Sequence, residues 1–259
     1  MITLRSFRGV RIIAAVACAA AAIATTVCDR TESSNAPVTS TTPAGSSTAP
    51  SPAVAKHRDE AMVRIVHAAP AGAQLDLFAG DLALFDGLGF KSVTPYRALD
   101  GQRYAFALRP AGMTQAKPLS SNTEALHDGN FYTAVAMPGD GHTPSLRIIH
   151  DRLDPPASGK AQLRVIHAGL DAGEVDVRDT SANQTLIDGV DYQSVTDYHE
   201  VSPINGAIQI VGNNADSSRV LVSLNAHLEA GRFYTIVIVG SASASPKLEA
   251  FLIEDALSP

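Results

Sequence analysis

Val63-Arg64-Ile65-Val66-His67-Ala68 recurs 100 residues later, from 63 to 163, as Leu163-Arg164-Val165-Ile166-His167-Ala168. Gly129-Asn130-Phe131-Tyr132-Thr133 recurs as Gly231-Arg232-Phe233-Tyr234-Thr235 at an offset of 102, from 129 to 231. The matching stretches keep their order with one small insertion, so the chain contains an internal duplication. The length of this duplication sets the number of domains, and its residues indicate the kind of fold.

The repeated unit has the size of a domain. Its period is about 100 residues, whereas solenoid repeats have periods of roughly 20–50 residues, and a unit of about 100 residues can hold its own core. The sequence therefore predicts tandem domains over 62–152 and 161–256. The joint, Asp154-Pro155-Pro156-Ala157-Ser158-Gly159, contains two prolines that prevent a strand from running through it. Because the joint is short, the two domains are expected to touch.

Both copies have the pattern of β-strands. Runs rich in Val, Ile, Leu, Phe and Tyr alternate with Gly, Pro, Asn and Asp, and an apolar period near 3.6 residues does not persist. Short strands of this kind, about seven per copy, predict an all-β protein with two tandem immunoglobulin-like β-sandwich domains. The predicted strands are 62–67, 74–79, 82–85, 103–109, 119–126, 131–137 and 145–150 in the first copy and 162–167, 174–178, 185–187, 207–212, 219–225, 233–239 and 247–254 in the second.

One motif sharpens the prediction of a sandwich. Leu126-His127-Asp128-Gly129-Asn130-Phe131-Tyr132 and Leu228-Glu229-Ala230-Gly231-Arg232-Phe233-Tyr234 both precede a strongly apolar stretch. This spacing is typical of a tyrosine corner, in which the hydroxyl of the Tyr bonds to backbone a few residues upstream. Tyr132 and Tyr234 are therefore predicted to be structural.

The first 28 residues have the composition of an export signal. Arg5, Arg8 and Arg11 precede an uncharged, alanine-rich run from Ile12 to Val27, as in a secretory signal peptide. That run is short for the roughly 20 apolar residues that span a bilayer. The sequence thus predicts an exported protein, periplasmic or on the cell surface.

Cys28 stands where the apolar run ends, as the lipid-attachment cysteine of bacterial lipoproteins does, although Val27 departs from the small residue expected before it. A lipid there would hold the protein at a membrane without a helix crossing it. The alternative is ordinary cleavage after Ala24, which releases a soluble protein. Residues 29–61 are rich in Ser, Thr, Pro and Ala, so a disordered linker is expected between the anchor and the domains.

The charge of the chain excludes some partners. The whole sequence has 20 basic and 26 acidic residues. Removal of the three arginines in residues 1–28 leaves 17 − 26, or −9. Nucleic acid requires clusters of Lys and Arg, and anionic headgroups repel an acidic surface. We therefore expect no nucleic acid and contact with a membrane only through the lipid anchor.

The repeated histidines are the most prominent candidates for chemistry. Since side chains alternate along a strand, Val63, Ile65 and His67 share the core-facing side, and His167 ends the equivalent row. Buried polar groups need partners, so His67 and His167 are predicted to be structural and to bond with Asp76 and Asp176 between strands. No set of catalytic, cofactor-binding or metal-binding residues emerges, because hydrolase, phosphate-loop and metal-ligand spacings are missing.

Val63-Arg64-Ile65-Val66-His67-Ala68 followed by a proline, with Leu75-Asp76-Leu77 after it and Gly129-Asn130-Phe131-Tyr132-Thr133 near the end of the unit, resembles the DUF4397 family. The resemblance covers both copies and implies an exported β-sandwich of unknown function, with no catalytic residues to carry over. Loops such as 138–144 and 240–246 differ between the copies, and recognition usually resides in variable loops on a shared scaffold.

The sequence therefore favours a non-catalytic binding or structural module whose partner is a protein or glycan of the cell envelope, without a cofactor. The alternative is a hydrolase that cleaves envelope glycan or peptide in a cleft between the domains. Such an enzyme requires accessible acids that converge there.

Overall fold

The computed structural model describes residues 59–70, 74–213 and 219–255. The predicted signal peptide 1–28, Cys28 and most of the predicted linker lie outside the described residues. In the part of the chain that is described, no helix has the length and apolarity needed to cross a membrane.

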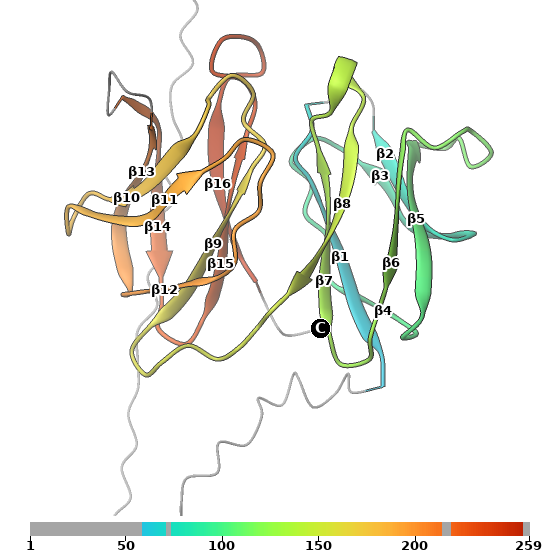
Figure 1. Ribbon diagram of the computed structural model, residues 1–259, viewed down its shortest axis with the longest axis horizontal. Helices are drawn as coiled ribbons and strands as arrows, with labels where there is room; N and C mark the ends of the chain where they lie inside the picture. The colour runs from blue at the N-terminus through green and yellow to red at the C-terminus, as the bar shows by residue number, and fades with distance from the viewer. Residues whose placement is uncertain (1–58, 71–73, 214–218, 256–259) are drawn as a thin grey trace, which may run out of the picture. The chain divides into compact units, whose positions relative to one another are not determined.

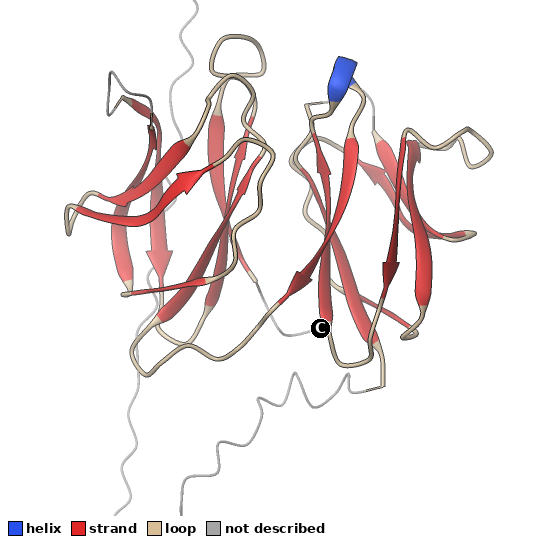
Figure 2. Ribbon diagram, viewed as in Figure 1, coloured by secondary structure: helices blue, strands red, loops and turns tan. Residues whose placement is uncertain are grey.

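The first repeat is a sandwich of two four-stranded sheets (Figures 1 and 2). One sheet has the order β4-β1-β7-β8 and the other β3-β2-β5-β6. Its strands are β1 (Ala61–His67), β2 (Leu75–Ala79), β3 (Leu82–Leu88), β4 (Arg97–Leu99), β5 (Arg103–Pro110), β6 (Ser120–Ala125), β7 (Phe131–Met137) and β8 (Ser145–Asp151), with a short 3-10 turn, η1 (Asp140–His142), between β7 and β8. β1 pairs with β7 in parallel, and its other neighbour, β4, is antiparallel.

The second repeat has the same topology, with sheets β12-β9-β15-β16 and β11-β10-β13-β14. The two tandem immunoglobulin-like sandwiches of an all-β protein are thus confirmed as the fold class. The strands are β9 (Ala161–His167), β10 (Val175–Asp179), β11 (Gln184–Val190), β12 (His199–Val201), β13 (Ile204–Gly212), β14 (Val220–Leu228), β15 (Phe233–Val239) and β16 (Glu249–Glu254).

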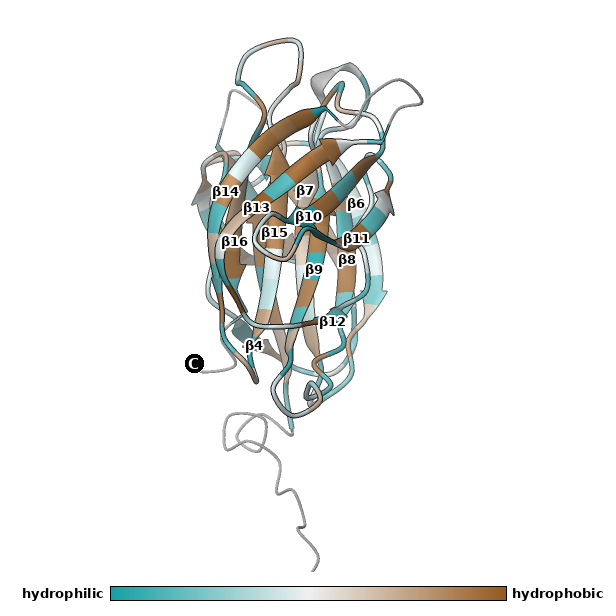
Figure 3. Cartoon of the chain, turned by 90° about the vertical axis from the view of Figure 1, so that its left-hand side faces the viewer, coloured by the Kyte–Doolittle hydropathy of each residue, from teal (hydrophilic) through white to brown (hydrophobic). Residues whose placement is uncertain are grey.

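Each sandwich has its own apolar core between its sheets. Ile65, Leu77 and Phe106 are fully buried in the first repeat, and Val165, Val177 and Ile208 in the second. Figure 3 shows hydrophobic residues interspersed with hydrophilic ones along β10, β13 and β14, as expected for strands with one face on a core.

The structure has one more strand per repeat than the sequence predicts. β4 and β12 were missed in both copies because each has three residues, two of them exposed. A strand this short carries no readable alternation of apolar and polar residues. Each pairs along the edge of the sheet that contains β1 or β9.

Several connections between strands lie at the same end of the two sandwiches. We call this end the loop end. It consists of residues 89–96, 111–119 and 138–144 of the first repeat and residues 168–174, 191–198 and 240–248 of the second. The Lys91 amide donates to the His67 carbonyl at 2.9 Å, and the Gln193 amide donates to the His167 carbonyl at 2.8 Å. Across the repeats, Gln193 Nε2 donates to the Pro138 carbonyl at 2.7 Å. The chain enters β1 and leaves β16 at the opposite end of these strands.

The central strands of the two repeats are buried on both faces. β1, β7, β9 and β15 are buried at every residue. One face of each strand covers its own core. The other contributes to a third apolar cluster that both repeats share: Val66, Ala68, Val135 and Met137 from the first repeat, and Ile166, Ala168, Val237, Val239 and Ile253 from the second. The predicted contact between the domains is therefore present, and the two repeats pack against each other through this shared cluster.

Candidate functional site

Two arginines lie in the middle of this interface. On β1, Arg64 alternates with Val63 and Ile65, so its side chain leaves the sandwich core and points to the other repeat. Its neighbour on β7 is Thr133, and the equivalent pair in the second repeat is Arg164 and Thr235. We call the following residues the crossed-arginine network: Arg64, Tyr96, Thr133 and Asp151 from the first repeat, with Arg164, Tyr198, Thr235 and Asp255 from the second.

Within the first repeat, the network organises the carboxylate of Asp151. Arg64 Nε donates to Thr133 Oγ1 at 2.9 Å, and the Thr133 hydroxyl donates to Asp151 Oδ2 at 2.6 Å. The Tyr96 hydroxyl donates to the same oxygen at 2.8 Å. The second repeat reproduces these contacts: Arg164 Nε to Thr235 Oγ1 at 2.9 Å, Thr235 to Asp255 Oδ2 at 2.7 Å, and Tyr198 to Asp255 Oδ2 at 2.8 Å.

The ion pairs cross from one repeat to the other. Arg164 Nη1 donates to Asp151 Oδ1 at 2.6 Å, and Arg64 Nη2 reciprocally donates to Asp255 Oδ1. Each guanidinium also lies over the tyrosine ring of its own repeat, 4.7 Å from the Tyr96 centroid and 4.6 Å from that of Tyr198. Each arginine is therefore positioned by its own sandwich and neutralised by the other.

All four charged groups are removed from water. Arg64 and Arg164 are 2% exposed, and Asp151 and Asp255 are 3% exposed. Burial alone lowers the pKa of the Arg64 guanidinium, but the facing Asp255 carboxylate, together with Tyr96 and Asp151, outweighs this effect and raises its pKa above the ordinary value. Burial raises the pKa of Tyr96, so its hydroxyl keeps the proton that it donates. Isolated buried charges are costly, and here each has an opposite charge and hydrogen-bond donors or acceptors.

This geometry bears on the hydrolase alternative. Among the described residues, the buried acids of the interface are Asp151 and Asp255, and each already accepts hydrogen bonds from an arginine, a threonine and a tyrosine. Because both are also buried, a substrate has no access to them. Their arrangement holds the repeats together and does not form the accessible pair of acids that the alternative requires.

The repeated histidines are buried, but their partners differ from the prediction. Burial lowers the pKa of His67 to about 4 and lowers that of His167 as well. His167 Nε2 lies 2.8 Å from the Gly173 carbonyl, and Nδ1 accepts from the Gly169 amide at 3.2 Å. Neither ring nitrogen of His67 has a hydrogen-bond partner among the described residues, which leave out 71–73.

The predicted bonds from these histidines to Asp76 and Asp176 are wrong. Both acids instead accept hydrogen bonds from backbone amides of glycines, including Gly87 in the adjacent strand β3 and Gly189 in the adjacent strand β11. Asp76 Oδ1 accepts from the Gly87 amide at 2.7 Å, and Oδ2 from the Gly112 amide at 2.8 Å. Asp176 Oδ1 accepts from the Gly189 amide at 3.1 Å. Gly87 and Gly189 have φ values of +64° and +63°, a conformation that favours glycine. The two acids thus fix a bulge between strands.

Tyr132 and Tyr234 form the hydrogen bonds expected of tyrosine corners. The Tyr132 hydroxyl accepts from the His127 amide at 3.0 Å, and the Tyr234 hydroxyl accepts from the Glu229 amide at 3.0 Å. Both rings are almost completely buried, so these residues serve the fold.

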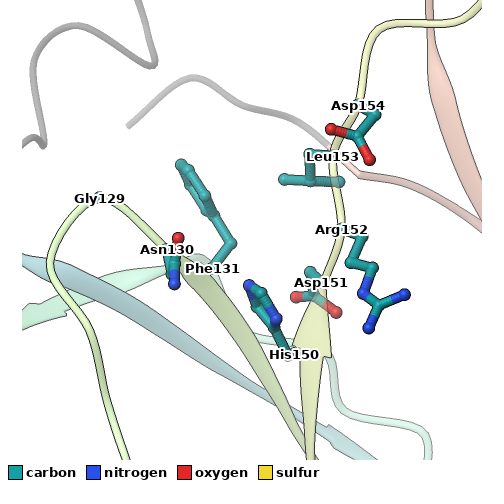
Figure 4. Close-up of a pocket in the computed structure, with 8 residues that line it drawn as sticks. All are labelled: Gly129, Asn130, Phe131, His150, Asp151, Arg152, Leu153 and Asp154. Atoms are coloured by element: carbon teal, nitrogen blue, oxygen red, sulfur yellow. The ribbon is translucent and has the colours of Figure 1, made fainter.

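Polar and charged side chains line the surface hollows of both repeats. One hollow of about 400 Å³ lies next to the crossed-arginine network and includes His150 in its lining. In Figure 4, Asn130 and Phe131 lie on one side of this hollow and Arg152 and Asp154 on the other. Asp151 also lines this hollow, but its side chain is fully buried and its carboxylate is bonded within the network. A second hollow of about 370 Å³ lies in the second repeat between Lys160, Asp179 and Glu200. Among the described residues no group of three or more His, Cys, Asp or Glu could hold a metal ion.

The loop end carries most of the exposed large apolar side chains. Among the described residues these are Leu82, Val93, Met113, Leu119 and Val220. Val93, Met113 and Leu119 belong to loop-end connections, and Val220 begins β14 at the same end. Leu82 is the first residue of β3, beside the β2–β3 turn at the other end. None of the five is aromatic.

Sequence comparison supports the duplication. The model of the family described as "Domain of unknown function (DUF4397)" matches residues 61–178 and 179–259, which confirms the two-copy resemblance. The boundary between the matches falls at the end of β10, whereas residues 152–160 join the two sandwiches. No curated protein matches the sequence.

Two solved structures of carbohydrate-binding modules are similar to the chain. One is a family CBM26 module from Eubacterium rectale in complex with maltoheptaose, 12% identical, covering 75% of this chain and 97% of that one, with a TM-score of 0.22. The other is from work on α-glucan recognition by family 41 modules of streptococcal virulence factors, 11% identical, covering 73% and 96%, also with a TM-score of 0.22. A TM-score of 0.22 is too low to indicate a shared ligand.

Proposed function

The chain belongs to the DUF4397 family, and we propose that it is an exported, non-catalytic binding module, anchored to a membrane through Cys28, that contacts a protein of the cell envelope with its loop end. The observation that carries this proposal is the placement of exposed aliphatic side chains at the end opposite to the point where the chain enters the first sandwich.

The interface between the repeats supports a role in which loops of both repeats are held in a fixed arrangement for a binding partner. Two sandwiches joined only by a linker would move independently, as domains with small interfaces do. Here a shared apolar cluster and two crossed ion pairs fix one repeat against the other. Loops from both repeats therefore form one preorganised surface, which reduces the entropy lost on binding.

The direction of the chain supports an outward-facing loop end. The segment that precedes Ala61 connects to the anchor proposed at Cys28, and β1 runs from Ala61 to the loop end at His67. An anchored molecule would therefore hold the loop end away from the membrane. A segment of the length predicted for the linker would have a root-mean-square reach of about 30 Å if it behaved as a flexible chain.

The exposed side chains favour a protein as the partner. Met113 is 59% exposed, Val220 44%, Leu119 38% and Val93 37%. These four side chains stand on separate segments of the same end, and exposed apolar side chains can mark contacts between proteins, in which Met is enriched. Their rarity elsewhere on the described surface makes the loop end the best candidate.

A site-specific photocrosslinker tests this proposal. We would place it at Met113 in the full chain, in its native host, and use Leu82 as the matched control because it is 52% exposed at the other end. We expect discrete envelope-protein adducts from position 113 and few from 82. Equal labelling from both positions, or adducts only with glycan, would refute a protein-binding loop end.

A further inference from the structure

We propose that two copies of this chain can exchange repeats, so that the first repeat of one copy packs against the second repeat of the other. The partner of the inter-repeat interface is then a second copy of the chain. The proposal rests on the interface itself and not on the proposed function.

The contacts across the interface are reciprocal. Arg64 of the first repeat binds Asp255 of the second, and Arg164 of the second binds Asp151 of the first. Thr133 and Thr235 occupy matching positions beside the arginines, as do Val135 and Val237 in the apolar cluster. This is the self-complementary pattern of a two-fold dimer interface, found here within one chain.

Residues 152–160 are the covalent connection that keeps both sides of this interface within one chain. They lie between Asp151, the last residue of β8, and Ala161, the first of β9. Nine extended residues span up to about 30 Å, so the repeats can separate without loss of either strand. The Ala157 amide donates to the Glu200 carboxylate at 2.7 Å, and both Glu200 and Ala157 are exposed, so opening the linker breaks few contacts. Pro155 and Pro156 favour an extended path.

Mass action sets the conditions for exchange. A short linker gives the tethered repeat an effective concentration in the millimolar range, so dilute chains close on themselves. Exchange is expected when chains open together at high concentration. Separating the repeats also exposes the apolar cluster that they share to water, which favours re-pairing over a long-lived open form.

Charge reversal in the full chain tests exchange directly. The variant Arg64→Asp places an acid opposite Asp255, so two negative charges face each other at this position. The variant Asp255→Arg places a base opposite Arg64, so two positive charges face each other there. Mixing the variants allows the altered first repeat of one to meet the altered second repeat of the other with opposite charges. The remaining two repeats then restore the original contact. We expect a one-to-one complex with twice the monomer mass in light scattering, formed only in the mixture.

The matched control reverses the exposed pair between Lys91 and Glu249, which also joins the repeats but is 42% and 52% exposed. Lys91→Glu and Glu249→Lys should stay monomeric when mixed. The proposal is overturned if the Arg64→Asp and Asp255→Arg chains keep β-sheet circular dichroism but remain monomeric together. It is also overturned if both pairs dimerise equally.

If either network variant fails to fold, refolding of the unaltered chain tests whether repeats are exchanged. This chain would be unfolded and refolded at micromolar and at millimolar concentration, then diluted and weighed by light scattering at once. A dimer that forms only in the concentrated sample and reverts slowly supports exchange. Monomer from both samples overturns it.

Discussion

Replacing Arg164 with Met should destabilise the folded chain strongly, because it removes the positive charge that is bonded to Asp151. The arginine is 2% exposed and lies 2.6 Å from Asp151, 2.9 Å from Thr235 and 3.3 Å from Thr133. Removing one partner of a buried pair costs about 3–5 kcal/mol. Asp151 keeps the hydroxyl donors Thr133 and Tyr96, which places the expected loss near the lower limit, about 3 kcal/mol.

Urea denaturation followed by circular dichroism measures this loss. With a slope of about 1–3 kcal/mol per molar urea, the midpoint should fall by roughly 1 M or more. Arg232→Met is the matched control, since Arg232 pairs with Glu254 but is 54% exposed, and an exposed pair contributes about 0–1 kcal/mol. Adding Asp151→Asn to Arg164→Met should recover part of the loss, because no unpaired charge remains buried. Equal midpoints for the Arg164 and Arg232 variants would refute the assignment of a stabilising role to the network.

The other predictions concern the histidines, the anchor and the separate repeats. Because the pKa of His67 falls to about 4 on folding, the unfolded chain binds a proton that the folded chain excludes between about pH 6.5 and 4. Stability should therefore drop as the pH falls through this window, by about 1.4 kcal/mol per unit at most, and His67→Gln should remove that part of the pH dependence. His67→Ala and His167→Ala should lower thermal stability equally with and without zinc, and a zinc-dependent shift lost in the variants would identify ligands. Intact mass of the membrane fraction should show a chain that begins at a lipid-modified Cys28, whereas an unmodified amino terminus at Thr25 would exclude the anchor. Each repeat expressed alone should aggregate or self-associate and become soluble on mixing, and two soluble monomers with well-dispersed amide spectra would contradict this.

The last of these expectations differs from what the sequence alone indicates. From the strand pattern, each copy has a full set of strands and a tyrosine corner, so each is predicted to fold by itself. The structure shows that Val66, Val135 and Met137 cover no part of their own core and are buried by the other repeat. A strand with one face on its own core and the other on a neighbour reads as continuously apolar, and the sequence does not say which neighbour covers it.

The sequence did contain a signal for the crossed-arginine network. Arg64 and Arg164 are charged residues in the middle of otherwise apolar strands, and both are repeated, as are Thr133 and Thr235. An arginine in such a position needs a buried acid. Asp151 and Asp255 were harder to find, because their offset is 104 residues, from 151 to 255, and each acid binds the arginine of the other copy. Local spacing cannot reveal a partner that lies 191 residues away in one case and 13 in the other.

The histidines show the opposite outcome. Their burial was predicted from the alternation of side chains. The partner of His167 is a backbone carbonyl, which is a group that every residue type carries. Backbone partners leave no trace in the identity of residues. Asp76 and Asp176 were equally misassigned because the glycine amides that they bind carry no side chain to suggest a contact.

A duplicated gene usually leaves one copy free to diverge while the other keeps the original role. The crossed ion pairs remove that freedom at four positions. Replacing Arg64 removes the ion-pair partner of Asp255 in the other copy, and replacing Asp151 removes the partner of Arg164. The two halves of the gene must therefore be inherited as a matched set. Recombination that joins a first repeat to a second repeat from another lineage is expected to be costly wherever it leaves one of these four charges buried without its partner.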